Sequence, residues 1–373
     1  MSAGGADRKL ILTAALDGPD YARCVRQAQI AEQAGFHAVV APESSDFRLG
    51  GNGEPEAALE PFSLLAALSA GTASIGLIAE VHAAYNEPYH IARKLGALDY
   101  MSRGRAGCHI APGPAAAAGN FGRTGEGGPG PRLLEAEAAA TEFAEALRLL
   151  WDSWEDDALV YDKRAGVQMD EGKVREIDYA GRYYAVKGPL NIARPPQGQP
   201  PVLFAVTGAR GRSAAAKEAD AAVAPLLSTA EAALMRADMR ARMVRNGRRA
   251  EDLRLLAELC PVVAETNEEA RELEHRLRQA FGAASERLIF AGTAAAVADR
   301  IEAWFRQEAI DGFHIAPLPR PDLLPAFAAK VVPELRRRGL FRAGGETSTL
   351  RSGLGLARPN NVFATLKRRG GSD

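Results

Sequence analysis

Residues 85–107 read YNEPYHIARKLGALDYMSRGRAG, and this stretch decides the fold. The apolar run Ile75–Ile78 precedes it and a second run, Ala106–Ala111, follows, while Pro88 stands where the first turn of a helix tolerates proline. The pattern predicts a strand, a helix and a second strand, which together form one parallel β-α-β unit. Parallel strands connected in this way build α/β sheets or barrels, whose ligands bind at the carboxyl ends of the strands.

The same alternation continues along the rest of the chain. Apolar runs with the length of strands are Leu10–Ala14, Ala38–Ala41, Ile75–Ile78, Ala106–Ile110, Val202–Ala205, Ala221–Ala224, Leu255–Val263 and Gly312–Ile315. Segments between them have the three-to-four residue apolar spacing of helices, among them Tyr21–Ala34, Leu133–Trp154, Ala230–Asn246 and Thr293–Gln307. Eight such repeats in one domain of this length favour a (β/α)₈ TIM barrel over an open sheet.

The chain is predicted to divide into a barrel domain, residues 1–342, and a C-terminal tail, residues 343–373. Residues 155–199 form an insertion before the fifth strand and are predicted to include a hairpin through Ile177–Val186. The Gly/Pro/Ala-rich segment Ala111–Arg132 indicates a mobile loop, either a lid or a merely flexible connection. The Gly/Arg/Ser-rich tail predicts a frayed terminus, with wrapping around a neighbouring subunit as the alternative.

The bulk composition excludes several classes of protein. The 373 residues carry a formal net charge of −1, which gives no reason to expect nucleic acid or an anionic membrane as a partner. Three widely spaced cysteines, Cys24, Cys108 and Cys260, predict neither a disulfide framework nor a zinc site. No run approaches the roughly 18 apolar residues of a membrane-spanning helix, and Met1–Lys9 lacks the apolar core of a signal peptide. We therefore predict a cytoplasmic protein.

Five separated segments carry a more specific signal. They are Tyr85–Gly107, Leu149–Leu159, Gly181–Gly198, Asp311–Phe313 and Val332–Arg342. In their amino-acid sequences, order and spacing they resemble the nitrilotriacetate monooxygenase branch of the bacterial-luciferase-like flavin monooxygenases. The resemblance implies a luciferase-like barrel that binds reduced FMN (FMNH₂) non-covalently, receives it from a separate NAD(P)H:flavin reductase, and uses O₂ to oxygenate a small organic substrate. It also implies a dimer, formed either with a second copy or with a homologue.

The resemblance places several residues around the flavin ring. Glu43 takes the place of a family Asp that helps to hold the ring; a strand-end carboxylate that caps the next loop is the alternative. Glu80 and His82 replace small hydroxyl residues at the end of the third strand and, two positions apart, share one face of it. His82 and His109 are predicted to line the ring face and to steer proton transfer as catalytic residues. Cys108 is interpreted as a small buried residue rather than a nucleophile.

Other positions are assigned to the phosphate and the substrate. Arg132 stands near the entrance of the fourth helix, where the family carries a polar His-Asp-Glu-Arg-Tyr run. Thr207, Gly208 and Arg210 are predicted to build an anion-binding turn at a helix N-terminus, although an ordinary strand-to-helix connection has the same composition. His314, on the eighth strand, occupies a position where the family commonly has Asn and is predicted to contact substrate.

Three functions are compatible with this sequence. The first, which we predict, is an FMNH₂-dependent monooxygenase with an altered pocket. The second is a non-catalytic partner subunit with a degenerate flavin site, because packing segments are retained while site residues differ. The third is a barrel with changed chemistry, in which carboxylates and imidazoles at the strand ends ligate a divalent metal or act as acid and base.

Overall fold

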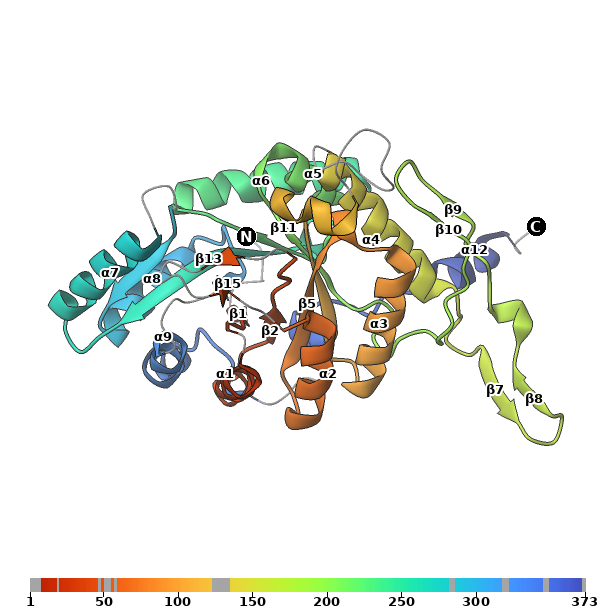
Figure 1. The fold of residues 1–373 in the computed structure, drawn as a ribbon, viewed down its shortest axis with the longest axis horizontal. Helices are drawn as coiled ribbons and strands as arrows, with labels where there is room; N and C mark the ends of the chain where they lie inside the picture. The colour runs from red at the N-terminus through yellow and green to blue at the C-terminus, as the bar shows by residue number, and fades with distance from the viewer. Residues whose placement is uncertain are drawn as a thin grey trace, which may run out of the picture.

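The computed structural model describes residues 8–18, 20–45, 48–49, 55–56, 59–122, 135–281, 286–316, 322–344 and 349–370. In this part of the chain, eight parallel strands close into a barrel, because the first strand pairs with the last (Figure 1). The strands are β1 (Ile11–Ala15), β2 (Ala38–Ala41), β5 (Gly76–His82), β6 (Ala106–Ala111), β11 (Val202–Ala205), β12 (Ala221–Ala224), β13 (Arg254–Val263) and β15 (Gly312–Ile315). Each of the eight predicted runs is one of these strands, which confirms the TIM barrel.

Helices cover the outside of the barrel (Figure 1). They are α1 (Tyr21–Gln33), α2 (Pro61–Gly71), α3 (Pro88–Met101), α4 (Ala136–Asp152), α5 (Gly208–Glu218), α6 (Thr229–Arg245), α7 (Asn267–Phe281), α8 (Ala294–Arg306), α9 (Leu323–Ala326) and α10 (Val332–Arg337). Pro88 opens α3 as predicted, and the Thr293 hydroxyl caps α8 by accepting from the Ala296 N–H. Within the described ranges, no helix combines the length and apolar character needed to cross a membrane.

One strand and one hairpin were missed by the sequence analysis. β14 (Ile289–Gly292) pairs with Cys260–Val263, the last four residues of the ten-residue strand β13, which continue past the barrel. In the insertion, β7 (Leu159–Asp162) and β8 (Val167–Met169) form an exposed hairpin that projects away from the barrel (Figure 1). The predicted second hairpin is confirmed as β9 (Tyr179–Ala180) with β10 (Ala185–Val186).

The loop after β6 is partly ordered as helix. Residues Ala115–Phe121 form a 3₁₀ helix, and the Phe121 ring stacks on Tyr85 with centroids 4.6 Å apart. Residues 123–134 lie outside the described ranges, so the expectation of a lid in this loop stays a prediction.

The C-terminal tail closes the amino-terminal end of the barrel, which corrects the expectation of a frayed terminus. Leu350 and Leu354, from the helix α11 (Leu350–Gly353) and the residue after it, pack with the innermost apolar residues of the strands. A Cβ added at Gly76 would lie 2.5 Å from Leu350 Cδ1, and one at Gly107 would lie 2.9 Å from Leu350 Cδ2. Glycine is therefore required at both strand positions to admit the leucine. The last helix, α12 (Val362–Gly370), follows α11 in the chain.

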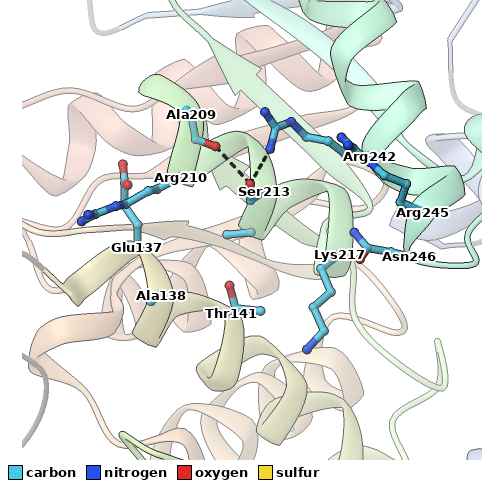
Figure 2. A pocket seen from close by; sticks show the side chains of 11 residues that line it. Glu137, Ala138, Thr141, Ala209, Arg210, Ser213, Lys217, Arg242, Arg245 and Asn246 are labelled. Atoms are coloured by element: carbon cyan, nitrogen blue, oxygen red, sulfur yellow. Dashed lines mark hydrogen bonds between the residues drawn. The ribbon is translucent and has the colours of Figure 1, made fainter.

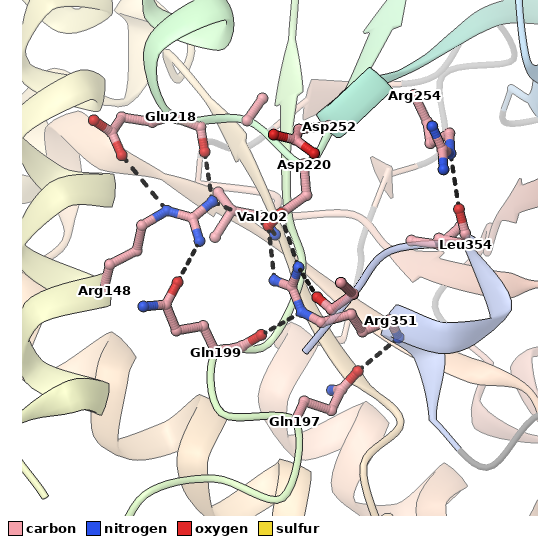
Figure 3. A network of polar contacts seen from close by, with 12 residues as sticks. Arg148, Gln197, Gln199, Val202, Glu218, Asp220, Asp252, Arg254, Arg351 and Leu354 are labelled. Carbon is pink, nitrogen blue, oxygen red and sulfur yellow. Dashed lines mark hydrogen bonds and ion pairs between the residues drawn. The ribbon is translucent and has the colours of Figure 1, made fainter. Parts of the chain in front are cut away.

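A buried ion pair holds the same segment in place (Figure 3). The Arg351 guanidinium donates to both carboxylate oxygens of Asp220 at 3.0 Å and to the Gln199 carbonyl at 2.9 Å. Asp220 also accepts from Arg148 at 3.0 Å and from the Val202 N–H at 2.9 Å. Burial alone would raise the pKa of Asp220, but the two guanidinium groups outweigh it and hold the pKa well below its usual range. The tail is therefore anchored to the floor of its own barrel.

Candidate active site

The strand register brings five polar residues into one layer inside the barrel. Thr13 pairs with His314, His314 with Glu258, and Glu80 with His109. On three of these strands the residue two positions earlier, Ile11, Ile78 or Leu256, belongs to the apolar cluster that includes Leu350. Side chains two apart on a strand share a face. Interiors of such barrels are usually filled by branched apolar residues. A polar layer toward the carboxyl ends of the strands therefore indicates a binding or catalytic site.

Glu80 lies at the centre of this arrangement, between two imidazoles. Its Oε1 is 3.4 Å from His82 Nε2, and its Oε2 is 3.4 Å from His109 Nδ1. Burial favours the neutral acid, but the imidazoles His109 and His82 outweigh this effect and lower the pKa of Glu80 to about 2. Glu80 is therefore an anion at neutral pH. The two-residue spacing correctly placed it beside His82, and a role for it was predicted only in the third alternative, as a metal ligand or an acid–base group.

His82 connects the polar layer to the rim of the barrel. Its Nδ1 lies 2.7 Å from the Oγ of Ser45, in the loop after β2. Glu43 precedes Ser45 in that loop and is half-buried. Burial raises the pKa of Glu43, while the nearby His82 opposes this shift. Glu43 thus lies near His82 at the mouth, and its role toward a flavin stays a prediction.

His109 is buried without hydrogen bonds. Its side chain is 8% exposed, and neither ring nitrogen has a hydrogen-bond partner among the described residues. The 3.4 Å contact of Nδ1 with Glu80 is an ion-pair distance rather than a well-directed hydrogen bond. Leaving a buried polar group unpaired costs about 1–3 kcal/mol. A buried imidazole without a hydrogen-bond partner among the described residues is available to a bound ligand or an ordered water.

The opposite side of the layer contains a neutral histidine. His314 Nδ1 lies 2.9 Å from the Thr13 hydroxyl, and its ring centroid is 6.4 Å from that of His109. Burial and then the proximity of His109 lower the pKa of His314 to about 3, so this imidazole is uncharged at neutral pH. Glu258 completes the layer, and burial raises its pKa. Sequence reasoning missed Thr13 and Glu258, although a single acid inside the apolar run Leu255–Val263 was a usable signal.

The predicted phosphate residues lie at the carboxyl end of β11. Gly208 has φ +83°, and no atom of the described residues lies within 4 Å of where its Cβ would be, so the turn into α5 is open in this part of the chain. Arg210, in the first turn of α5, lines a cavity of about 760 Å³ between α4, α5 and α6 (Figure 2). Glu137, Lys217 and other residues of these helices line the same cavity. Arg132 lies outside the described residues, so its assignment stays a prediction, as do those of Thr207, Gly208 and Arg210.

Two alternative chemistries, a cysteine nucleophile and a metal site, find no support among the described residues. Cys108 is fully buried, and burial raises the pKa of its thiol far above the usual range, which agrees with a packing role. Among the described residues, no group of three or more His, Cys, Asp or Glu side chains is arranged to hold a metal ion.

The ionisable residues gathered at the carboxyl ends of the strands lie where enzymes with parallel barrels have their active sites. Residues 5–312 match the family described as luciferase-like monooxygenases. The chain belongs to this family and is a flavin-dependent monooxygenase.

Relatives agree with this assignment over most of the chain. Nitrilotriacetate monooxygenase component A from Aminobacter aminovorans is 35% identical, over 83% of this chain and 82% of the relative. Dibenzothiophene-sulfone monooxygenase from Rhodococcus erythropolis is 32% identical, over 85% and 83%. The structure of EDTA monooxygenase from Chelativorans sp. BNC1 has a TM-score of 0.81 at 26% identity, over 94% of this chain and 99% of that one. These similarities confirm the predicted fold and the predicted reaction class.

Proposed function

We propose that this monooxygenase uses FMNH₂, delivered by a separate NAD(P)H:flavin reductase, to insert one oxygen atom of O₂ into a small organic substrate. The observation that carries the proposal is the buried imidazole of His109, whose ring nitrogens have no hydrogen-bond partner among the described residues, in a polar layer at the mouth of the barrel. We also propose a cytoplasmic protein that works as a dimer, with a second copy or with a homologue. The substrates named for the relatives, nitrilotriacetate and dibenzothiophene sulfone, do not select one for this chain.

The residues present fit a flavin at this end of the barrel. His109 offers ring nitrogens that lack partners among the described residues, and Glu43 offers a carboxyl group at the rim. The open turn at Thr207 and Gly208, with Arg210, offers backbone N–H groups and a cation for a phosphate. Reduced FMN would supply the two electrons that let one atom of O₂ enter the substrate while the other leaves as water.

The chain's own groups would hold the ligands and handle protons. Glu80, as an anion, keeps His82 and His109 in place on either side of it. His82 is the imidazole nearest the rim and exchanges protons through the Ser45 hydroxyl. His314 is neutral and buried, so it acts as a hydrogen-bonding group toward the substrate rather than as a charge.

FMN binding to the variants His109→Ala and Arg210→Ala tests this proposal. Binding is measured by the quenching of flavin fluorescence. We expect each variant to bind about tenfold more weakly than the wild type, because each loses one hydrogen bond or ionic contact to the ligand. His275→Ala, an exposed change on α7, is the matched control and should bind as the wild type does. If both site variants bind as the wild type does, the pocket is placed wrongly. If the wild type does not bind, the non-catalytic partner subunit becomes the better account.

A further inference from the structure

The carboxylate of Glu80 contacts different nitrogens on its two histidines. It faces the Nε2 of His82 and the Nδ1 of His109, each at 3.4 Å. A neutral imidazole carries one N–H and one lone pair, and the surroundings decide which nitrogen carries the proton. A lone pair turned toward an anion is repelled, whereas an N–H is attracted. The nitrogen nearest Glu80 is therefore the protonated one on each ring.

The contact with Ser45 is compatible with this assignment, because a serine hydroxyl can donate to a lone pair as well as accept from an N–H. With the proton of His82 on Nε2, its Nδ1 is a lone pair, and the Ser45 hydroxyl at 2.7 Å donates to it. With the proton of His109 on Nδ1, its Nε2 is a lone pair inside the barrel. Nothing in the described part of the chain donates to that nitrogen. The series of contacts from Ser45 through His82 and Glu80 therefore ends at His109 Nε2, a buried acceptor without a donor among the described residues.

We propose that Glu80 is a positioning residue that fixes opposite tautomers on His82 and His109, so that His109 presents an unprotonated Nε2 to a donor N–H or O–H of the bound ligand. The inference rests on the proposed function and deepens it, because it names the chemistry of the ligand group at this position. A carboxylate group of a ligand is excluded there, since it would meet Glu80 as a like charge and bring no donor. None of the five side chains of the polar layer (Thr13, Glu80, His109, Glu258 and His314) is a Lys or Arg, and the cation Arg287 acts on Glu258.

Two ligands carry a suitable donor. One is the flavin, through the imide N–H of its pyrimidine ring, and the other is the substrate, through an amine, amide or hydroxyl group. Both give the same chemistry at His109 Nε2. FMN and its analogue 3-methyl-FMN, which lacks the imide N–H, distinguish them.

The tautomers are observable by ¹⁵N NMR of histidine-labelled protein without ligand, since the chain has six histidines. We expect the pattern of an Nε2–H tautomer for His82 and of an Nδ1–H tautomer for His109. In Glu80→Gln the amide accepts from one ring and must donate to the other, so one of the two histidines should change its tautomer. Glu80→Asp keeps the anion and should preserve both. Glu272→Gln, an exposed change on α7 outside the polar layer, is the control and should leave both tautomers unchanged.

Ligand addition to the same sample completes the test. If the flavin is the donor, FMN should shift the His109 Nε2 resonance toward lower frequency, and 3-methyl-FMN should bind about tenfold more weakly. If the substrate is the donor, both flavins should bind alike, and methylammonium but not acetate should shift that resonance. A doubly protonated His109, an Nε2–H tautomer, or a response to acetate overturns the inference. Failure of FMN to bind, with the two tautomers as assigned, would instead count against the proposed function alone.

Discussion

Replacing Arg351 by alanine should destabilise the barrel strongly, because its guanidinium is 5% exposed and forms an ion pair with an Asp220 side chain that is 9% exposed. The change removes two contacts of 3.0 Å with that carboxylate and one of 2.9 Å with the Gln199 carbonyl. Breaking a buried ion pair by removing one partner costs about 3–5 kcal/mol, since the remaining charge stays buried. Asp220 keeps Arg148, which places the expected loss near the lower end, at about 3 kcal/mol.

The assay is unfolding in urea, with the melting temperature as a second measure. An unfolding entropy of about 2.1 cal/mol/K per residue converts a loss of about 3 kcal/mol into a drop of about 4 °C for a chain of this size. Arg358→Ala is the matched control from the same tail: its ion pair with Asp156 is about half exposed, so its loss should cost less than about 1 kcal/mol. Equal stabilities of Arg351→Ala and Arg358→Ala would refute the conclusion that the tail is anchored through a buried charge.

Three further predictions follow from burial. Gly76→Ala should lower stability by about 1–3 kcal/mol in urea unfolding, since its Cβ would lie 2.5 Å from Leu350 Cδ1 and 2.8 Å from the His37 carbonyl oxygen. Gly71→Ala meets no atom of the described residues within 4 Å and should be neutral. The free energy of unfolding should fall as the pH drops from 6.5 toward 3. The pKa of His314 is lowered to about 3 in the folded state, so over this range its imidazole binds a proton only when the protein is unfolded. His314→Asn should therefore lose less stability than the wild type over the same range. The three cysteines are all buried, so a thiol reagent should label none in the native protein and three after unfolding; rapid native labelling of Cys108 would contradict its packing role.

The sequence alone was sufficient to predict the barrel. Each barrel strand is an apolar run between helical segments, and the repeat of this pattern is a local property that periodicity detects. β14 was missed because its four residues run directly into the N-cap of α8. The tail was interpreted wrongly because its fixing contacts, from Leu350 and Arg351, are made with residues more than a hundred positions away.

The candidate site was predictable only in part for the same reason. Spacing on one strand showed that Glu80 and His82 share a face, and the resemblance directed attention to His109 and His314. The contact between Glu80 and His109 depends on the register of two strands, which no single segment of sequence determines. Ser45 and Thr13 were missed because a hydroxyl residue in a loop or a strand has no distinguishing pattern.

If the chain is an FMNH₂-dependent monooxygenase, the mouth of this barrel binds a reduced flavin. Anaerobic calorimetric titration with FMNH₂ tests it most directly. We expect one flavin to bind per chain at micromolar concentration, with the affinity reduced about tenfold in His109→Ala. The absence of any binding heat for FMNH₂, or an affinity that is unchanged in His109→Ala, would contradict it.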